Sequence, residues 1–165
     1  MTRTHTTTDT PVGELTLVAE DGALVGVYYP GHWTRPDPAS FGERSERGFE
    51  EVERQLGEYF AGRRTAFALT TALSGDGLHR TVWDLIDQIP YGQTTTYGEL
   101  ARQLGDATLA RAVGGAVGHN PLSVIVPCHR VVGKDGKLTG YAGGLRRKQF
   151  LLSLESGEPC TQPLF

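Results

Sequence analysis

The sequence predicts an α/β protein in two parts: an N-terminal antiparallel sheet with a flanking helix, and a mainly helical C-terminal domain that contains a helix-turn-helix. Three observations support this prediction. Apolar and polar residues alternate in the N-terminal third, and apolar residues recur at helical spacing in the C-terminal half. Between these segments lies the flexible tetrapeptide Ser74-Gly75-Asp76-Gly77. We therefore expect a sheet and helix domain over residues 1–74 and a second domain over residues 75–165.

A β-hairpin and a helix account for the N-terminal domain. Leu15, Leu17 and Ala19 fall on one face of a strand, Asp21-Gly22 supplies a turn, and the alternation then resumes. Apolar residues recur at helical spacing over residues 49–60, among many charges. This pattern predicts a helix that covers the sheet.

The C-terminal domain begins with an amphipathic helix that Pro90 stops. Thr96 and Glu99 fit a capping box in front of a short helix, which Gly105 ends. Asp106 is placed to cap a second short helix. Two short helices across a turn that contains glycine predict a helix-turn-helix.

The remainder of the chain surrounds a cysteine. An apolar, β-branched run over residues 124–126 leads, as a predicted strand, into Pro127-Cys128-His129-Arg130. Residues 140–144 form a glycine-rich loop, and apolar residues at 150–154 predict a last helix. The tail after this helix contains proline and is expected to be loosely ordered.

The composition excludes several classes of protein. With 38% hydrophobic and 21% charged residues, the chain is ordinary for a globular protein and unlike a disordered or fibrous one. No apolar run approaches the length of a membrane span, and the polar stretch Met1 to Thr10 lacks the apolar segment of a secretory signal. A cytoplasmic protein is therefore expected.

The charge is small and unevenly distributed. A net charge of −3 argues against a protein that coats nucleic acid through charge alone. Residues 1–78 contain seven basic and twelve acidic side chains, whereas residues 79–165 contain nine and seven. A polyanionic partner is therefore expected to bind the C-terminal half.

The chain has two cysteines, Cys128 and Cys160, without CxxC spacing, so we expect neither a disulfide framework nor a zinc site. Cys128 stands beside His129 and Arg130, where positive charge favours the reactive thiolate. A thiol with a pKa of about 8.5 is mostly protonated at neutral pH, so a neighbouring base raises its nucleophilic fraction. The alternative is a buried structural cysteine, which a Cys-His pair by itself would favour. Cys160 is assigned no role.

Four stretches resemble the 6-O-alkylguanine-DNA alkyltransferase family. They are Arg111-Ala112-Val113-Gly114-Gly115-Ala116, Asn120-Pro121, Val126-Pro127-Cys128-His129-Arg130-Val131-Val132, and Gly140-Tyr141 with Gly143-Gly144. The resemblance covers residues 78–156 closely and the N-terminal part in general layout. It implies direct DNA repair by a single-turnover alkyltransferase, in which Cys128 irreversibly takes the alkyl (methyl) group from a 6-O-alkylguanine. The thioether product agrees with this, because water does not cleave it as it would a thioester.

The resemblance also implies roles for residues around Cys128. His129 would act through a bound water as the base, and Glu155 would orient its imidazole. Asn120 would brace the turn between the recognition helix and the cysteine strand, and Tyr97 would donate a proton to the departing purine. Apart from the resemblance, a solvated carboxylate near a helix end is the favoured interpretation of Glu155, and Tyr97 is equally consistent with a core-facing aromatic.

Contacts with DNA are implied as well. Arg111 would fill the gap left by an extruded base, and the small residues of its helix would let the backbone approach the minor groove. Tight helix packing is the other interpretation of these small residues. Tyr141 would stack on the damaged base, while Ala142 stands where the family often has serine, which leaves a backbone amide to hold the guanine oxygen. The expected substrate and DNA contacts are Arg111, Tyr97, Ala112, Gly114, Gly115, Val131, Tyr141, Ala142 and Gly143.

The expected partner is double-stranded DNA that contains alkylated guanine, bound through its minor groove by a monomer. No cofactor and no metal are expected, because the N-terminal part contains no cysteine and only two histidines, His5 and His32. The cations Arg146, Arg147 and Lys148 are expected on a solvated helix face. Three alternatives remain open: a non-catalytic binder of alkylated DNA lesions on the same fold, a helix-turn-helix transcription factor, and a Cys-His hydrolase.

Every role above requires the sulfur of Cys128 to lie at the mouth of a pocket that an everted base can enter.

Overall fold

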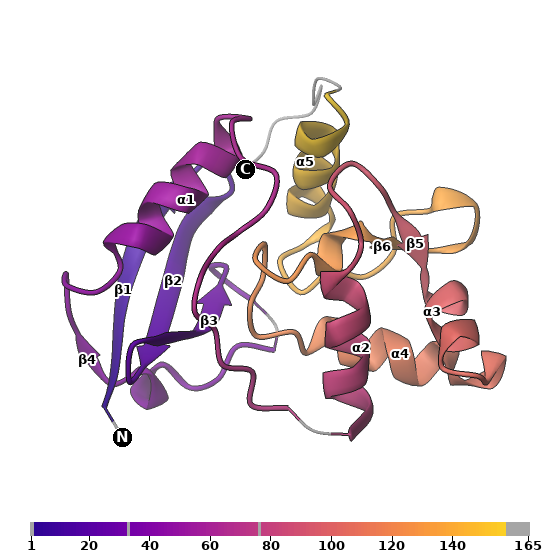
Figure 1. Cartoon of the computed structure of the whole chain (residues 1–165), viewed down its shortest axis with the longest axis horizontal. Coiled ribbons are helices and arrows are strands. Elements are labelled where there is room, and N and C mark those ends of the chain that lie inside the picture. The colour runs from indigo at the N-terminus through magenta and orange to yellow at the C-terminus, as the bar shows by residue number, and fades with distance from the viewer. Residues whose placement is uncertain (1, 33, 76, 158–165) are drawn as a thin grey trace. The chain divides into compact units, whose positions relative to one another are not determined.

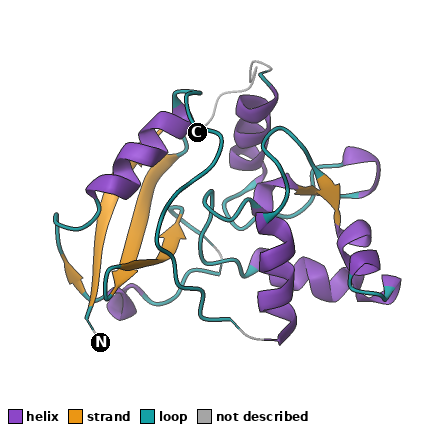
Figure 2. Cartoon of the chain, viewed as in Figure 1, coloured by secondary structure: helices purple, strands orange, loops and turns teal. Residues whose placement is uncertain are grey.

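Figure 1 shows the computed structural model, which describes residues 2–32, 34–75 and 77–157. The chain forms two compact units: Met1–Ser74 with Pro121–Ile125, and Gly75–Asn120 with Val126–Phe165. The main sheet belongs to the first unit, and helices dominate the second (Figure 2). The predicted α/β class is therefore confirmed, while the division into domains stays a prediction.

The sheet of the first unit has four strands in the order β3-β2-β1-β4. They are β1 (Arg3–Thr10), β2 (Gly13–Glu20), β3 (Ala23–Tyr28) and β4 (Glu43–Arg44). The first three pair antiparallel, and the short β4 pairs parallel with β1. Asp21 and Gly22 join β2 to β3 with φ of 50° and 86°, the positive values that a two-residue hairpin turn needs. The predicted hairpin is confirmed.

Strand β1 is missing from the sequence prediction because no apolar alternation marks it. Its sequence is Arg-Thr-His-Thr-Thr-Thr-Asp-Thr, and β-branched threonine favours extended backbone. The strand pairs with β2 along its whole length, with Thr6 opposite Leu17. Thr6 is completely buried, so the inward face of β1 is polar where an apolar residue would be expected.

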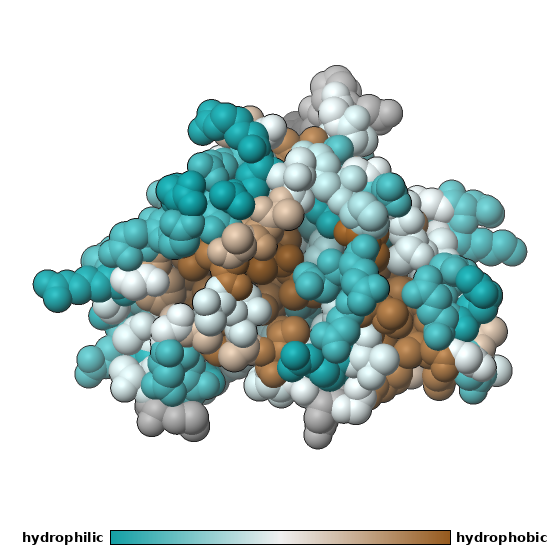
Figure 3. Space-filling model, in the orientation of Figure 1, coloured by the Kyte–Doolittle hydropathy of each residue, from teal (hydrophilic) through white to brown (hydrophobic). Residues whose placement is uncertain are grey.

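Helix α1 (Glu50–Phe60) covers one face of this sheet, as predicted (Figure 1). Its buried residues are Val52, Gln55, Leu56 and Tyr59. The outward face is hydrophilic (Figure 3), and there Arg54 forms ion pairs with Glu51 and Glu58. This separation into two faces is what places an amphipathic helix on a sheet.

The segment before the cysteine differs from the prediction. Residues 124–126 form a turn in place of the expected strand. Val124 has a φ of 70°, and the N–H of Ile125 donates to the carbonyl of Ser123 at 2.8 Å, which closes a γ-turn. The extended pairing occurs earlier, where the N–H of Val27 in β3 donates to the carbonyl of Pro121 at 2.8 Å. Val124 and Val126 are buried, but the run itself is bent, and the contact with β3 is made by the residues just before it.

Four helices and one short strand pair build the second unit. The helices are α2 (Gly77–Asp87), α3 (Tyr97–Gln103), α4 (Ala110–Gly118) and α5 (Leu145–Ser156). Strands β5 (Thr95–Thr96) and β6 (Val131–Val132) pair parallel. Single 3-10 turns occur in both units: η1 (Pro38–Phe41), η2 (Ala107–Leu109), η3 (Cys128–Arg130) and η4 (Lys134–Gly136).

Helices α3 and α4 pack against each other across a short turn. The hydroxyl of Thr96 accepts a hydrogen bond from the N–H of Glu99 at 3.0 Å, so Thr96 caps α3 as predicted. Gly105 follows with a φ of 91°. The Asp106 carboxylate accepts from the N–H of Thr108 at 2.9 Å, so it caps η2, one turn before α4.

Helix α2 supports α4 from the other side. The indole N–H of Trp83 donates to the carbonyl of Ala116 in α4 at 2.8 Å, and both residues are buried. Val82, Ile86, Val113 and Val117 complete the apolar contact between the two helices. Within the described residues, no helix is long and apolar enough to cross a bilayer.

Candidate active site

Cys128 begins the 3-10 turn η3 and is held by its backbone. Its N–H donates to the carbonyl of Val126 at 2.7 Å, across Pro127 with φ −80° and ψ 63°, which is an inverse γ-turn. The side-chain amide of Asn120 donates to the same carbonyl at 2.9 Å. Asn120 follows α4 and is 2% exposed, so the end of that helix and the cysteine share one acceptor.

The thiol of Cys128 is buried, with 4% of the residue exposed. Burial raises its pKa above the ordinary value, while hydrogen bonds with Asn120 and Tyr141 and the charge of Lys148 act in the opposite direction. The expected cation beside the sulfur was Arg130, and this expectation is wrong, because Lys148 holds that place. A protonated thiol needs a base before it can act as a nucleophile.

His129 lies next to the cysteine and is completely buried. Its Nε2 lies 2.7 Å from Oε2 of Glu155, and since a carboxylate only accepts, Nε2 carries the proton. Nδ1 has no hydrogen-bond partner among the described residues. Burial lowers the pKa of His129, although Glu155 opposes this shift, so the imidazole is neutral. A buried, neutral imidazole with an unpaired nitrogen is suited to accept a proton.

Glu155 binds both His129 and Arg130 and is only 7% exposed, so the solvated alternative for this residue is wrong. Besides His129, it accepts hydrogen bonds from Arg130: Nε donates to Oε1 at 2.7 Å and Nη2 to Oε2 at 3.0 Å. The position of Glu155 in the last full turn of α5 brings it back beside η3. The contact could not be read from the sequence, since 26 residues separate Glu155 from His129.

Lys148 was expected on a solvated helix face, and this expectation is wrong. Instead of a solvated cation it is a fully buried one, and its ammonium donates to the carbonyls of Val131 at 2.6 Å and Thr139 at 2.8 Å. It also lies 5.9 Å from the ring centre of Tyr97. Burial lowers its pKa to about 8. Arg146 is exposed, as expected.

Two tyrosines flank the thiol. Tyr141 is 6% exposed and hydrogen-bonds with Cys128, which acts to lower the pKa of the thiol. Tyr97 is half-buried, and its hydroxyl lies 3.5 Å from the carbonyl of Gly140. Burial raises the pKa of Tyr97, which keeps its phenol protonated at neutral pH.

The other predicted contact residues fall into two places. Val131 and Gly143 are buried and Ala142 partly so, all near the loop that Lys148 holds. Arg111, Ala112 and Gly115 are exposed on α4, and partly exposed Gly114 backs onto the ring of Tyr97. The structure therefore gathers Cys128, His129, Glu155, Asn120, Tyr141 and Lys148 in one buried cluster, and presents the α4 residues on the surface.

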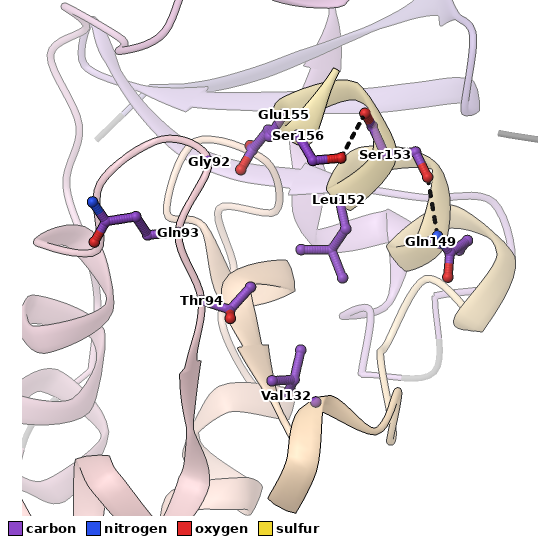
Figure 4. Close-up of a pocket in the computed structure, with 10 residues that line it drawn as sticks. Gly92, Gln93, Thr94, Val132, Gln149, Leu152, Ser153, Glu155 and Ser156 are labelled. Carbon is purple, nitrogen blue, oxygen red and sulfur yellow. Dashed lines mark hydrogen bonds between the residues drawn. The ribbon is translucent and has the colours of Figure 1, made fainter. Parts of the chain in front are cut away.

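A cavity of about 200 Å³ opens beside Glu155 (Figure 4). Three side chains point into it: Thr94 from the segment before β5, Val132 from β6 and Leu152 from α5. Cys128 is not one of its lining residues. This cavity does not reach Cys128, which is itself 4% exposed.

Within the described residues, no three His, Cys, Asp or Glu side chains lie close enough to hold a metal ion. Cys160 and the tail predicted to be loosely ordered lie outside the described residues.

The cluster has the parts needed to ionise one thiol on demand, which is the chemistry of proteins that use a single cysteine as nucleophile. Two family models match this chain. Residues 4–73 match "6-O-methylguanine DNA methyltransferase, ribonuclease-like domain", and residues 77–157 match "6-O-methylguanine DNA methyltransferase, DNA binding domain". The chain belongs to the 6-O-methylguanine DNA methyltransferase family, as its sequence motifs indicate.

Relatives match nearly end to end. A methylated-DNA–protein-cysteine methyltransferase from Mycolicibacterium paratuberculosis is 47% identical over 98% of this chain and 98% of that protein. One from Methanosarcina acetivorans is 44% identical over 89% of this chain and 94% of that protein. The crystal structure of Mycobacterium tuberculosis OGT in complex with DNA aligns with a TM-score of 0.86 and 41% identity, over 95% of this chain and 94% of that one.

Proposed function

We propose that this protein repairs DNA directly, by transferring the alkyl (methyl) group of a 6-O-alkylguanine to its own Cys128. The observation that supports this most strongly is the buried Cys128 beside a neutral His129, whose Nδ1 is unpaired. A structural cysteine has no need of such a neighbour. The family membership supplies the substrate.

The reaction begins with the thiol proton. It passes to Nδ1 of His129 through a water molecule, and the sulfur attacks the alkyl carbon. The S–C bond forms as the C–O bond breaks, and the electron pair of that bond stays on the purine. Tyr97 protonates the purine and is reprotonated from the imidazolium, so no proton is gained or lost overall. Glu155 remains ionised throughout and stabilises the imidazolium.

The product limits the protein to one event. A thioether on Cys128 is not hydrolysed, in contrast to the thioester of a hydrolase. The protein is therefore consumed in proportion to the lesions that it repairs.

DNA is proposed to bind at helices α3 and α4, used as a helix-turn-helix with α4 in the minor groove. The exposed Ala112 and Gly115 support this, because a Cβ at Gly115 meets nothing within 4 Å and the backbone is open to approach. The target base would be everted toward Cys128, and Arg111 would fill the gap it leaves. We further propose that the protein acts as a monomer in the cytoplasm.

Four residues would line the place that the base takes up: Val131, Tyr141, Ala142 and Gly143. Tyr141 hydrogen-bonds with Cys128, so its ring is near enough to the sulfur to stack on a base that reaches it. The backbone N–H of Ala142 would donate to the guanine oxygen, because alanine has no hydroxyl to do so. Asn120 would keep η3 in place through the Val126 carbonyl.

A duplex that contains 6-O-methylguanine tests this proposal. Cys128 is expected to carry a methyl group after one equivalent of repair, as measured by peptide mass spectrometry. Cys128→Ala is expected to abolish transfer and to retain binding to the damaged duplex. Repair without modification of Cys128, repeated turnover, or damage binding without any transfer would each refute the proposal, and the last would favour a non-catalytic lesion binder.

A further inference from the structure

Arg130 makes more contacts in the buried cluster than a surface ion pair would. Its guanidinium grips Glu155 with two hydrogen bonds of 2.7 and 3.0 Å, and its Nη1 donates to the carbonyl of Ile89 at 2.6 Å. The group also lies 5.7 Å from the ring centre of Tyr91. Arg130 is 7% exposed, so these contacts are made almost without water. Such a planar fork holds a carboxylate in one orientation.

Charged groups of both signs act on the imidazole. From α5, the carboxylate of Glu155 raises the pKa of His129 and the ammonium of Lys148 lowers it, and from η3 the guanidinium of Arg130 lowers it as well. Asp87 at the end of α2 interacts with Arg130 at longer range. The carboxylate therefore has one buried cation, Arg130, bound directly to it.

We propose that Arg130 is a positioning residue of the alkyl transfer: its charge keeps Glu155 ionised without a second proton, and so keeps His129 neutral with Nδ1 available to the thiol. This inference rests on the proposed function. In this role Arg130 controls the charge of His129 and does not contact the reacting atoms.

The physical argument is the cost of a buried, uncompensated carboxylate. Without the guanidinium, Glu155 would lose the cation that binds it directly, and the site would gain stability by binding a proton. The imidazole is the group that accepts it, because the resulting imidazolium pairs with the carboxylate at 2.7 Å. Burial, Arg130 and Lys148 lower the pKa of His129, whereas Glu155 raises it, so loss of Arg130 moves the pKa upward. An imidazolium cannot accept the thiol proton.

The test is the single-turnover rate of methyl transfer from a 6-O-methylguanine duplex, measured from pH 5.5 to 9. Wild type is expected to show no loss of rate toward neutral pH from protonation of His129. Arg130→Met is expected to lose roughly tenfold or more near pH 6.5, since one pKa unit changes the deprotonated fraction tenfold below the pKa. Its rate is expected to recover to within about threefold of wild type near pH 9, where the imidazole is again neutral.

Three variants separate charge from structure. Arg130→Lys keeps a cation without the fork, so its pH profile should have the wild-type shape. The double variant Arg130→Met with Glu155→Gln removes both charges. Its reaction should be slower, but without the loss of rate toward acidic pH (the acidic limb) that is expected of Arg130→Met. Arg54→Met removes an arginine that also grips a glutamate, but on the exposed face of α1, and should match wild type.

The outcomes are distinct. A loss in Arg130→Met that is the same at every pH would mean a merely structural role and would overturn the inference. Should Arg130→Met fail to fold, Arg130→Lys decides: a new acidic limb in that variant would contradict the inference, and the wild-type shape would support it. Absence of transfer by wild type at any pH would instead overturn the proposed function.

Discussion

Lys148 shows how a cation is accommodated inside a small protein. Its ammonium replaces lost water with the carbonyls of Val131 and Thr139, which belong to β6 and to the loop after η4. One side chain therefore ties the strand that follows Cys128 to the loop that covers it. These carbonyls do not fully replace water, so burial still disfavours the charged form and lowers the pKa of Lys148 to about 8.

This lowered pKa predicts a pH dependence of stability. In the unfolded chain Lys148 titrates near its ordinary pKa of 10.5, and in the folded protein at about 8. Below pH 8 the lysine is charged in both states, and between these values the unfolded state binds more protons, so the contribution of Lys148 to the free energy of unfolding rises with pH. Urea unfolding of wild type and Lys148→Met should therefore diverge in favour of wild type from about pH 8 upward.

Lys134→Met provides the control, because Lys134 is exposed in η4. Its unfolding free energy should follow that of wild type at every pH. If wild type and Lys148→Met instead stay parallel from pH 7 to 10, the buried ammonium does not titrate as described.

Arg111 gives a prediction about DNA rather than stability. If its side chain fills the gap in the base stack, Arg111→Ala should slow repair in a duplex by at least about fivefold, because roughly 1–3 kcal/mol of contact is lost. Removal of the alkyl group from free 6-O-methylguanine should change by less than about twofold, since no stack is opened there. Equal losses with both substrates would remove this assignment.

At the level of elements, α4 combines two opposing requirements. Its inward face packs Val113, Ala116 and Val117 against the unit, while Gly115 leaves the backbone uncovered on the other side. A glycine inside a helix costs stability relative to alanine. Gly115 therefore makes α4 less stable than alanine would at this position, and close approach of DNA would explain why glycine stands there.

Gly115→Ala tests that explanation. The added methyl group meets nothing within 4 Å, so the variant should be more stable by about 1 kcal/mol in thermal or urea unfolding. Its affinity for duplex DNA should nevertheless fall, by roughly tenfold for a contact worth about 1.4 kcal/mol. Fluorescence anisotropy with a labelled duplex measures the change.

Gly57→Ala is the matched control, since Gly57 lies inside α1 and a Cβ there also meets nothing within 4 Å. It should gain similar stability and bind DNA like wild type. A Gly115→Ala protein with unchanged affinity would argue against contact between α4 and the minor groove.

At the scale of the whole molecule, the buried sulfur predicts that repair weakens the fold. Cys128 is 4% exposed and hydrogen-bonds with Tyr141, so a methyl group on sulfur must find room in a packed site. Inserting one carbon into such a site costs about 1–3 kcal/mol. At roughly 2–4 °C per kcal/mol, calorimetry should record a lower melting temperature for the methylated protein. An unchanged melting temperature would mean that space beside the sulfur already exists.

The sequence predicts local features well and long-range ones poorly. The Asp21-Gly22 turn, the Thr96 cap and the helix over residues 49–60 depend on neighbours in the chain, and the structure confirms all three. Strand β1 carries no apolar alternation, and the bend at Val124 rests on a single residue with positive φ, so neither is visible in a periodicity.

The site divides in the same way. Cys128 and His129 are adjacent and could be recognised together, and the family motifs pointed to Glu155. The grip of Arg130 on Glu155 and the burial of Lys148 depend on how α5 packs over η3, and no local pattern encodes that packing. In helix α5 a lysine that follows two arginines looks solvated until the carbonyls that surround it are placed.

The Val126 carbonyl, finally, connects Cys128 to the end of helix α4 through hydrogen bonds. One oxygen atom receives both the amide of Asn120, two residues beyond α4, and the N–H of Cys128. A tilt of α4 by a bound duplex would reach the sulfur through two hydrogen bonds, and alkylation would return along the same route. Contact of α4 with DNA and the state of the thiol would then each affect the other.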